Sequence, residues 1–193
     1  MTKSWAMIAG VALAALVAPS GARAQELTGT TDASCSFAFV ERFSPGVTMT
    51  PSSPAQSSEG GWISCTGTLQ GKRITGPGTF SNDGHLDNAN CLIDHSLGTY
   101  RFTVPTDGGP LSVQGTYDLV RTGLTFNVIA EQPGAIGSGS GIVVPIKGDC
   151  VVTPLTEALV FMTVRFTDAP ATTRICDLDL GVVQLSCRSR DAI

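Results

Sequence analysis

The alternation of apolar and polar residues along successive segments constrains this chain most strongly. Two-residue turns at Gly108-Gly109 and Thr122-Gly123 would place Val104 opposite Val113 and Leu119 opposite Phe126. Both turns assign the same inner face to the segment that they share, and a one-residue slip would scramble that face. The pattern therefore predicts a three-stranded meander with an apolar surface formed by Tyr100, Phe102, Val104, Val113, Tyr117, Leu119, Phe126 and Val128.

Composition and further patterning extend this prediction to the whole chain. After Ala24 there are 21 Thr, 14 Val and 9 Ile but only 2 Lys and 5 Glu, which favours strands over helices. A turn at Gly71-Lys72 would pair Leu69 with Ile74. We therefore expect an all-β domain, a single antiparallel barrel or sandwich of about 8 to 11 strands, with a mobile loop at 44–61. Additional strands are expected at Ser36–Arg42, Gly141–Ile146, Cys150–Thr153 and Ala158–Thr167.

Glycine followed by threonine and a large apolar residue recurs four times. The intervals are irregular, so this is no true repeat. Glycine inside a strand allows strong bending or a bulge, which a closed or curled sheet requires. The alternative is chance recurrence in a Gly-rich β-protein. The four sites begin at Gly67, Gly78, Gly98 and Gly115.

The first 24 residues have the pattern of an export signal. Lys3 precedes an apolar run, and Ala22-Arg23-Ala24 resembles a cleavage site before Gln25. Cleavage would remove two basic residues and no acid, so the net charge of −4 becomes −6. We expect a secreted single domain at 25–193 with no transmembrane segment after signal removal, and the acidic charge argues against nucleic acid as a partner.

Export delivers the six cysteines to an oxidising compartment, where an even number implies disulfides rather than a metal cluster. A turn at Gly181-Val182 places Cys176 directly opposite Cys187, and we predict a bond between them. The same hairpin puts Asp177 and Asp179 on its solvent face. Three pairings remain open for the other four cysteines, which are Cys35, Cys65, Cys91 and Cys150.

Oxygen and imidazole groups concentrate between residues 82 and 95. An ordinary turn is the favoured interpretation, and a cation site is the alternative. A catalyst based on His85 or His95 would have to use this region, although no nucleophile elbow is present. We therefore predict no catalytic residue, metal or cofactor, and lean against an enzyme. The candidate cation ligands are Asp83, Asp87, Asn88, Asn90 and Asp94.

The Gly-Thr strands, the signal and the run Val144–Pro154 resemble small, mostly uncharacterised exported β-proteins of high-GC Gram-positive bacteria. The resemblance covers residues 60–165 and implies a secretory barrel or sandwich, with no catalytic residue carried over. The leading hypothesis is a non-catalytic binding module for a small apolar ligand or a protein partner. The alternatives are a hydrolase or isomerase with a His95/His85-based site, and an envelope-associated structural protein. The ligand and the oligomeric state stay open.

Overall fold

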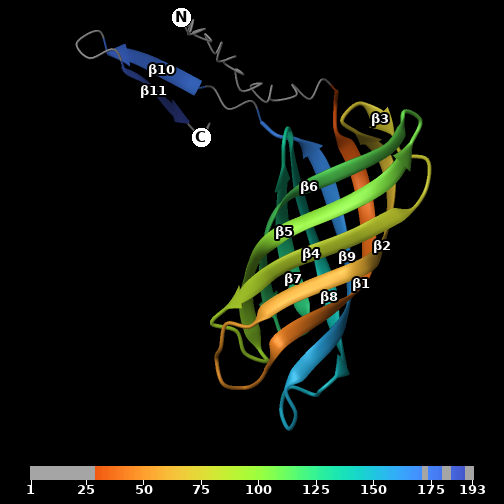
Figure 1. Cartoon of the computed structure of the whole chain (residues 1–193), viewed down its shortest axis with the longest axis vertical. Coiled ribbons are helices and arrows are strands. Elements are labelled where there is room, and N and C mark those ends of the chain that lie inside the picture. The colour runs from red at the N-terminus through yellow and green to blue at the C-terminus, as the bar shows by residue number, and fades with distance from the viewer. Residues whose placement is uncertain (1–28, 171–173, 180–183, 190–193) are drawn as a thin grey trace, which may run out of the picture.

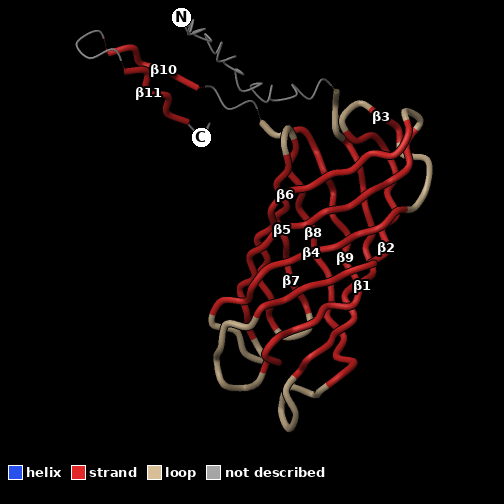
Figure 2. Tube along the Cα trace, viewed as in Figure 1, coloured by secondary structure: helices blue, strands red, loops and turns tan. Residues whose placement is uncertain are grey.

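A computed structural model describes residues 29–170, 174–179 and 184–189, and the expected signal at 1–24 lies outside them. These residues form eleven strands, and no helix among them is long and apolar enough to cross a bilayer. The main sheet is antiparallel, with strand order β1-β9-β8-β7-β6-β5-β4-β2-β3, and β1 also pairs with β2 (Figures 1 and 2). Eight strands thus close into a barrel and β3 adds to its rim. The strands are β1 (Asp32–Val47), β2 (Ala55–Leu69), β3 (Lys72–Arg73), β4 (Gly78–Asp87), β5 (Ile93–Thr106), β6 (Gly109–Thr122), β7 (Thr125–Gln132), β8 (Ala135–Lys147), β9 (Leu155–Asp168), β10 (Arg174–Asp179) and β11 (Gln184–Ser189).

The predicted meander is present as β5, β6 and β7, with its turns displaced. Val104 pairs with Leu111 rather than Val113, because the β5–β6 turn is Asp107-Gly108. The Thr106 hydroxyl closes this turn by accepting from the Gly108 N–H and donating to the Gly109 carbonyl. Each displacement moves the partner by two residues, and a two-residue shift leaves every side chain on its original face.

The other two turns are displaced in the same way. Leu119 pairs with Val128 rather than Phe126, because the β6–β7 turn is Gly123-Leu124. Leu69 pairs with Lys72 rather than Ile74, because the β2–β3 turn is Gln70-Gly71, both with positive φ. All eight predicted inner residues of the meander belong to the core or pack against it.

Two other expectations about the backbone were wrong. The loop expected at 44–61 spans only 48–54, because β1 continues to Val47 and β2 begins at Ala55. The segment Cys150–Thr153 is a loop rather than a strand. The Asp149 carboxylate accepts the backbone N–H groups of residues 151, 152 and 153, and these amides are therefore unavailable to a neighbouring strand.

Close approach between strands explains the recurring Gly-Thr pairs. A Cβ added at any of the four glycines would lie less than 3.0 Å from a backbone carbonyl oxygen of a neighbouring strand. Only glycine fits at such a distance. These glycines therefore allow a neighbouring backbone to approach closely, which is a different role from the bending that was expected.

The barrel interior has two apolar clusters. The larger fills most of the length and is rich in aromatic rings, such as Phe102 and Phe166, whose centroids lie 6.0 Å apart. The smaller cluster lies at the end of the barrel that carries the loop between β1 and β2. It consists of Val47, Leu86, Ala89, Cys150 and Leu155, and Phe43 and Cys91 pack against it.

Two disulfides settle the pairing that the sequence left open. Cys35–Cys65 joins directly paired residues of β1 and β2, where the barrel closes, and Cys91–Cys150 ties together two loops at the lower end in Figure 1. In the separate β10–β11 hairpin, Cys176 and Cys187 pair in register as predicted. Their side chains and the turn at 181–182 lie outside the described part of the chain, so the bond itself stays a prediction.

Candidate functional site

The residues proposed as cation ligands do not converge. Asp83 and Asp87 are exposed on the outer face of β4, whereas Asp94 points into the barrel. Asn90 accepts the N–H groups of Leu92 and Ile93, which is turn chemistry. Asn88 is exposed and has positive φ. Within the described residues no three His, Cys, Asp or Glu side chains gather in a way that could hold a metal.

The histidines also lie outside the barrel interior. His95 Nε2 is 2.9 Å from Asp118 Oδ1, and both side chains are about half exposed on the outer wall. His85 is exposed on β4. Neither histidine lines an internal cavity. Because both side chains of the His95–Asp118 pair are exposed on the outer wall, the pair is not shielded from water.

The inner wall instead carries a belt of polar side chains between the two apolar clusters. Alternation aims them inward from five strands, so groups far apart in the chain surround one space. We call this set the polar belt. Its members are Glu41 on β1, Gln56 on β2, Asn82 on β4, Asp94 and Ser96 on β5, and Tyr117 and Arg121 on β6.

The ion pair between Asp94 and Arg121 anchors the belt to the lower loops. The two residues are direct partners in the β5–β6 register, and Arg121 Nε donates to Asp94 Oδ2. Three further guanidinium N–H groups donate to the carbonyls of Asn90, Cys91 and Gly123. Desolvation raises the pKa of Asp94, although Arg121 counteracts this. Arg121 thus holds both the loop after β4 and the turn between β6 and β7.

Glu41 is the belt residue whose buried carboxyl group is least compensated by hydrogen bonds or opposite charges. It is 5 % exposed, and its Oε2 accepts from Asn82 Nδ2 at 2.9 Å. Within the part of the chain that the structure describes, its Oε1 has no hydrogen-bond partner, nor does Asn82 Oδ1. Burial raises the pKa of Glu41 to about 7; the Asn82 hydrogen bond opposes this and the charge of Asp83 adds to it. A carboxyl that titrates near neutral pH inside a cavity is typical of functional sites.

A hydrogen-bonded trio forms the side of the belt next to Glu41. Gln56 Nε2 donates to both Ser96 Oγ and the Tyr117 hydroxyl, and burial raises the pKa of Tyr117 to about 12. A Cβ on Gly98 would lie 2.6 Å from the Tyr117 hydroxyl, and one on Gly84 would also clash with it. Because Gly84 and Gly98 have no Cβ, they leave the space that the Tyr117 hydroxyl occupies.

Two small cavities lie within the barrel. One of about 60 Å³ is lined by belt residues, and one of about 40 Å³ by apolar side chains such as Phe37, Phe80 and Met162. They share four lining residues, so they adjoin: Phe39, Asn82, Tyr117 and Leu119. Both are well below the 300 to 1,000 Å³ typical of sites for drug-sized ligands.

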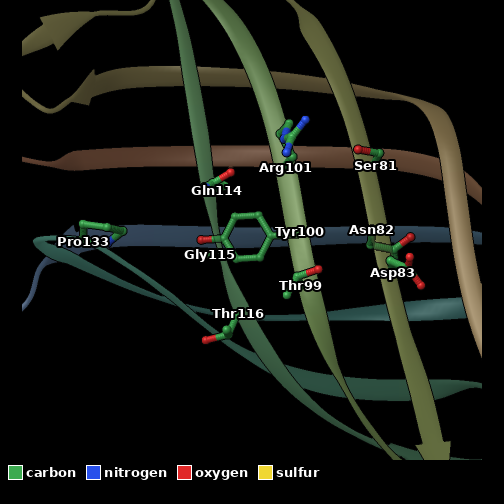
Figure 3. A pocket seen from close by; sticks show the side chains of 10 residues that line it. All are labelled: Ser81, Asn82, Asp83, Thr99, Tyr100, Arg101, Gln114, Gly115, Thr116 and Pro133. Atoms are coloured by element: carbon green, nitrogen blue, oxygen red, sulfur yellow. The ribbon is translucent and has the colours of Figure 1, made fainter. Parts of the chain in front are cut away.

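A larger hollow of about 520 Å³ lies on the outer wall. Figure 3 shows the side chains that line it, most of which come from β4, β5 and β6. Arg101, Gln114 and Thr116 are exposed there, as are Asp83 and Thr99. Side chains on this open surface are exposed to solvent, so the hollow does not exclude water as a closed site would. We interpret this hollow as ordinary polar surface.

A contiguous apolar area occupies another part of the outer wall. Across β2, β1, β9 and β8, Trp62, Ala38, Phe161 and Ile142 are successive register partners, and Val40, Leu159 and Val144 form the next row. We call these seven residues the outer apolar face. Exposed fractions are 49 % for Trp62, 42 % for Phe161 and 45 % for Ile142. A groove of about 390 Å³ runs beside these side chains.

Comparison of the chain with models of protein families, with characterised proteins and with solved structures found no match. The chain is a closed, disulfide-linked antiparallel barrel with a polar belt inside and an apolar area outside.

Sequence reasoning placed Tyr117 on the inner face of the meander and named Asp94 as a candidate cation ligand, but it did not place the other five belt residues inside the barrel. Extending the inner face of the meander by alternation would also have placed Ser96 and Arg121 inside, because they have the same parity as Tyr100 and Tyr117. The same alternation places Glu41 on the face of Phe39 and Asn82 on the face of Phe80, but the contact between Glu41 and Asn82 depends on the order of the strands around the barrel.

Proposed function

We propose that this chain is an exported, non-catalytic binding module that docks a protein partner on the outer apolar face. The observation that carries the proposal is the exposure of Trp62, Phe161 and Ile142 in one uninterrupted row. Monomeric soluble proteins rarely expose contiguous apolar areas larger than a few hundred Å². Tryptophan is also enriched among residues that dominate binding energies.

The surroundings of the outer apolar face favour a protein partner. Ion pairs bracket it along β1 and β9: Arg165–Asp32 on one side and Arg42–Glu157 on the other. An apolar centre inside a polar, charged rim is the usual anatomy of a protein interface. The partner should therefore present an apolar patch without charged side chains opposite Trp62.

A small apolar ligand inside the barrel has less support. The interior is occupied by packed rings, such as Phe37 against Phe80 at 5.1 Å, and the cavities of about 40 and 60 Å³ leave no room for a drug-sized molecule.

Site-specific photocrosslinking tests the docking proposal. A benzophenone amino acid at position 62 should give one discrete adduct in the producing culture, whereas the same group at Ser112, exposed on β6, should give none. Phe161→Asp should abolish the adduct without lowering Tm, because its side chain is exposed. Equal adducts at both positions, or none, would refute docking at this face. An adduct of twice the chain mass would show that the partner is a second copy of this chain rather than a different protein.

Export is a separate part of the proposal. The two disulfides are compatible with an extracellular protein. Amino-terminal sequencing of the protein from the culture medium should begin at Gln25. Recovery only from the cytoplasm, with Met1 retained, would contradict export.

A further inference from the structure

The polar belt supports an inference that is independent of the outer apolar face. We propose that the cavity beside Glu41 binds a small protonated amine of the size of ammonium or methylammonium. Glu41 Oε1 and Asn82 Oδ1 would accept its N–H groups, and the adjoining apolar cavity would receive an alkyl group.

The first support is the pair of unused acceptors. Glu41 is 5 % exposed, yet its Oε1 is buried and has no hydrogen-bond partner among the described residues, and the same is true of Asn82 Oδ1. Buried polar groups are nearly always hydrogen-bonded, and an unmatched acceptor costs about 1 to 3 kcal/mol. Both residues line the cavity of about 60 Å³, and an ammonium group supplies the N–H donors that they lack.

The second support is charge. The ionisable side chains lining the same cavity are Asp94, Arg121 and Tyr117, and the nearby Asp83 adds negative potential. Arg121 is engaged by Asp94 and three loop carbonyls. None of these groups neutralises the negative charge of an ionised Glu41. A bound cation would therefore supply the opposite charge that the cavity lacks.

The third support is the chemistry of the walls. Among the described residues, Glu41 and Asp94 are the only carboxylates lining the cavity. Because Asp94 is paired, a calcium ion would not find its six to eight oxygen ligands there. Aromatic rings do lie close: Phe39 lines both cavities and packs against Phe80 at a centroid distance of 4.7 Å. Rings beside a carboxylate favour alkylammonium ions over metal ions.

Calorimetric titration of the full-length protein with methylammonium chloride at pH 8 tests the proposal, with NaCl and tetraethylammonium chloride as comparison salts. We expect saturable heat with methylammonium alone, because tetraethylammonium has no N–H group and exceeds the cavity. Glu41→Gln should weaken binding at least tenfold. The matched control Glu59→Gln removes an exposed carboxylate and should leave binding unchanged.

The pH dependence provides a second measurement that needs no variant. A proton on Glu41 competes with the amine, so Kd should rise about tenfold for each pH unit below 7. No heat, equal heat with NaCl, full binding by the Glu41→Gln variant, or a Kd unchanged between pH 6 and pH 8 would each overturn the proposal. If the Glu41→Gln variant failed to fold, the pH series on the unsubstituted chain would decide.

Discussion

Replacing Glu41 by glutamine should change how the stability of this protein depends on pH. The glutamine keeps the shape of the side chain and removes its charge. Burial raises the pKa of folded Glu41 from its ordinary 4.5 to about 7, so the folded state holds its proton where the unfolded chain has released it. The stabilisation from this group is fully present below pH 4.5 and is lost as the pH rises through 7.

The magnitude follows from the two pKa values. Their separation corresponds to about 3 kcal/mol of unfolding free energy, lost between pH 4.5 and pH 8. Glu41 is 5 % exposed, so solvent screening reduces this figure little. The raised pKa of Asp94 acts in the same direction, but it is present in both proteins and cancels when they are compared.

Urea denaturation at pH 4.5, 6, 7 and 8 measures this effect. The Glu41→Gln variant should match the unsubstituted protein at pH 4.5 and exceed its stability by about 3 kcal/mol at pH 8. Glu59→Gln, at an exposed position of β2, should show no such trend. A stability difference for Glu41→Gln that stays constant from pH 4.5 to pH 8 would show that the carboxyl is not desolvated, and would refute the reasoning.

Three further predictions concern other parts of the chain. Asp94→Asn leaves the buried Arg121 unpaired and should lower the unfolding free energy by about 3 to 5 kcal/mol in urea titrations; a loss under about 1 kcal/mol would contradict the structural role of the pair. Gly98→Ala forces a Cβ against the Tyr117 hydroxyl and should cost about 1 to 3 kcal/mol, so an unchanged Tm would argue against this packing. A non-reducing tryptic map should yield residues 175–188 as one internally bridged peptide, and linkage of Cys176 or Cys187 elsewhere would disprove their bond.

The positions of the turns show what local sequence could not decide. The hairpins at 104–113 and 119–128 were expected with pairings two residues away from those observed. Either register keeps the same side chains inside, so alternation cannot distinguish them. The choice depends on details of the turn, such as the Thr106 hydroxyl bonding to Gly108 and Gly109.

By itself, the sequence determined the all-β class, the inner face of the meander and the Cys176–Cys187 register, because a period of two depends only on neighbouring residues. The tertiary structure decided everything that joins distant segments. Closure of β1 onto β2 paired Cys35 with Cys65 and turned Glu41 toward Asn82. Those contacts depend on strand order and curvature around the whole barrel, and no local pattern records them. The raised pKa of Glu41 has the same origin, since only the closed barrel removes its carboxyl from water.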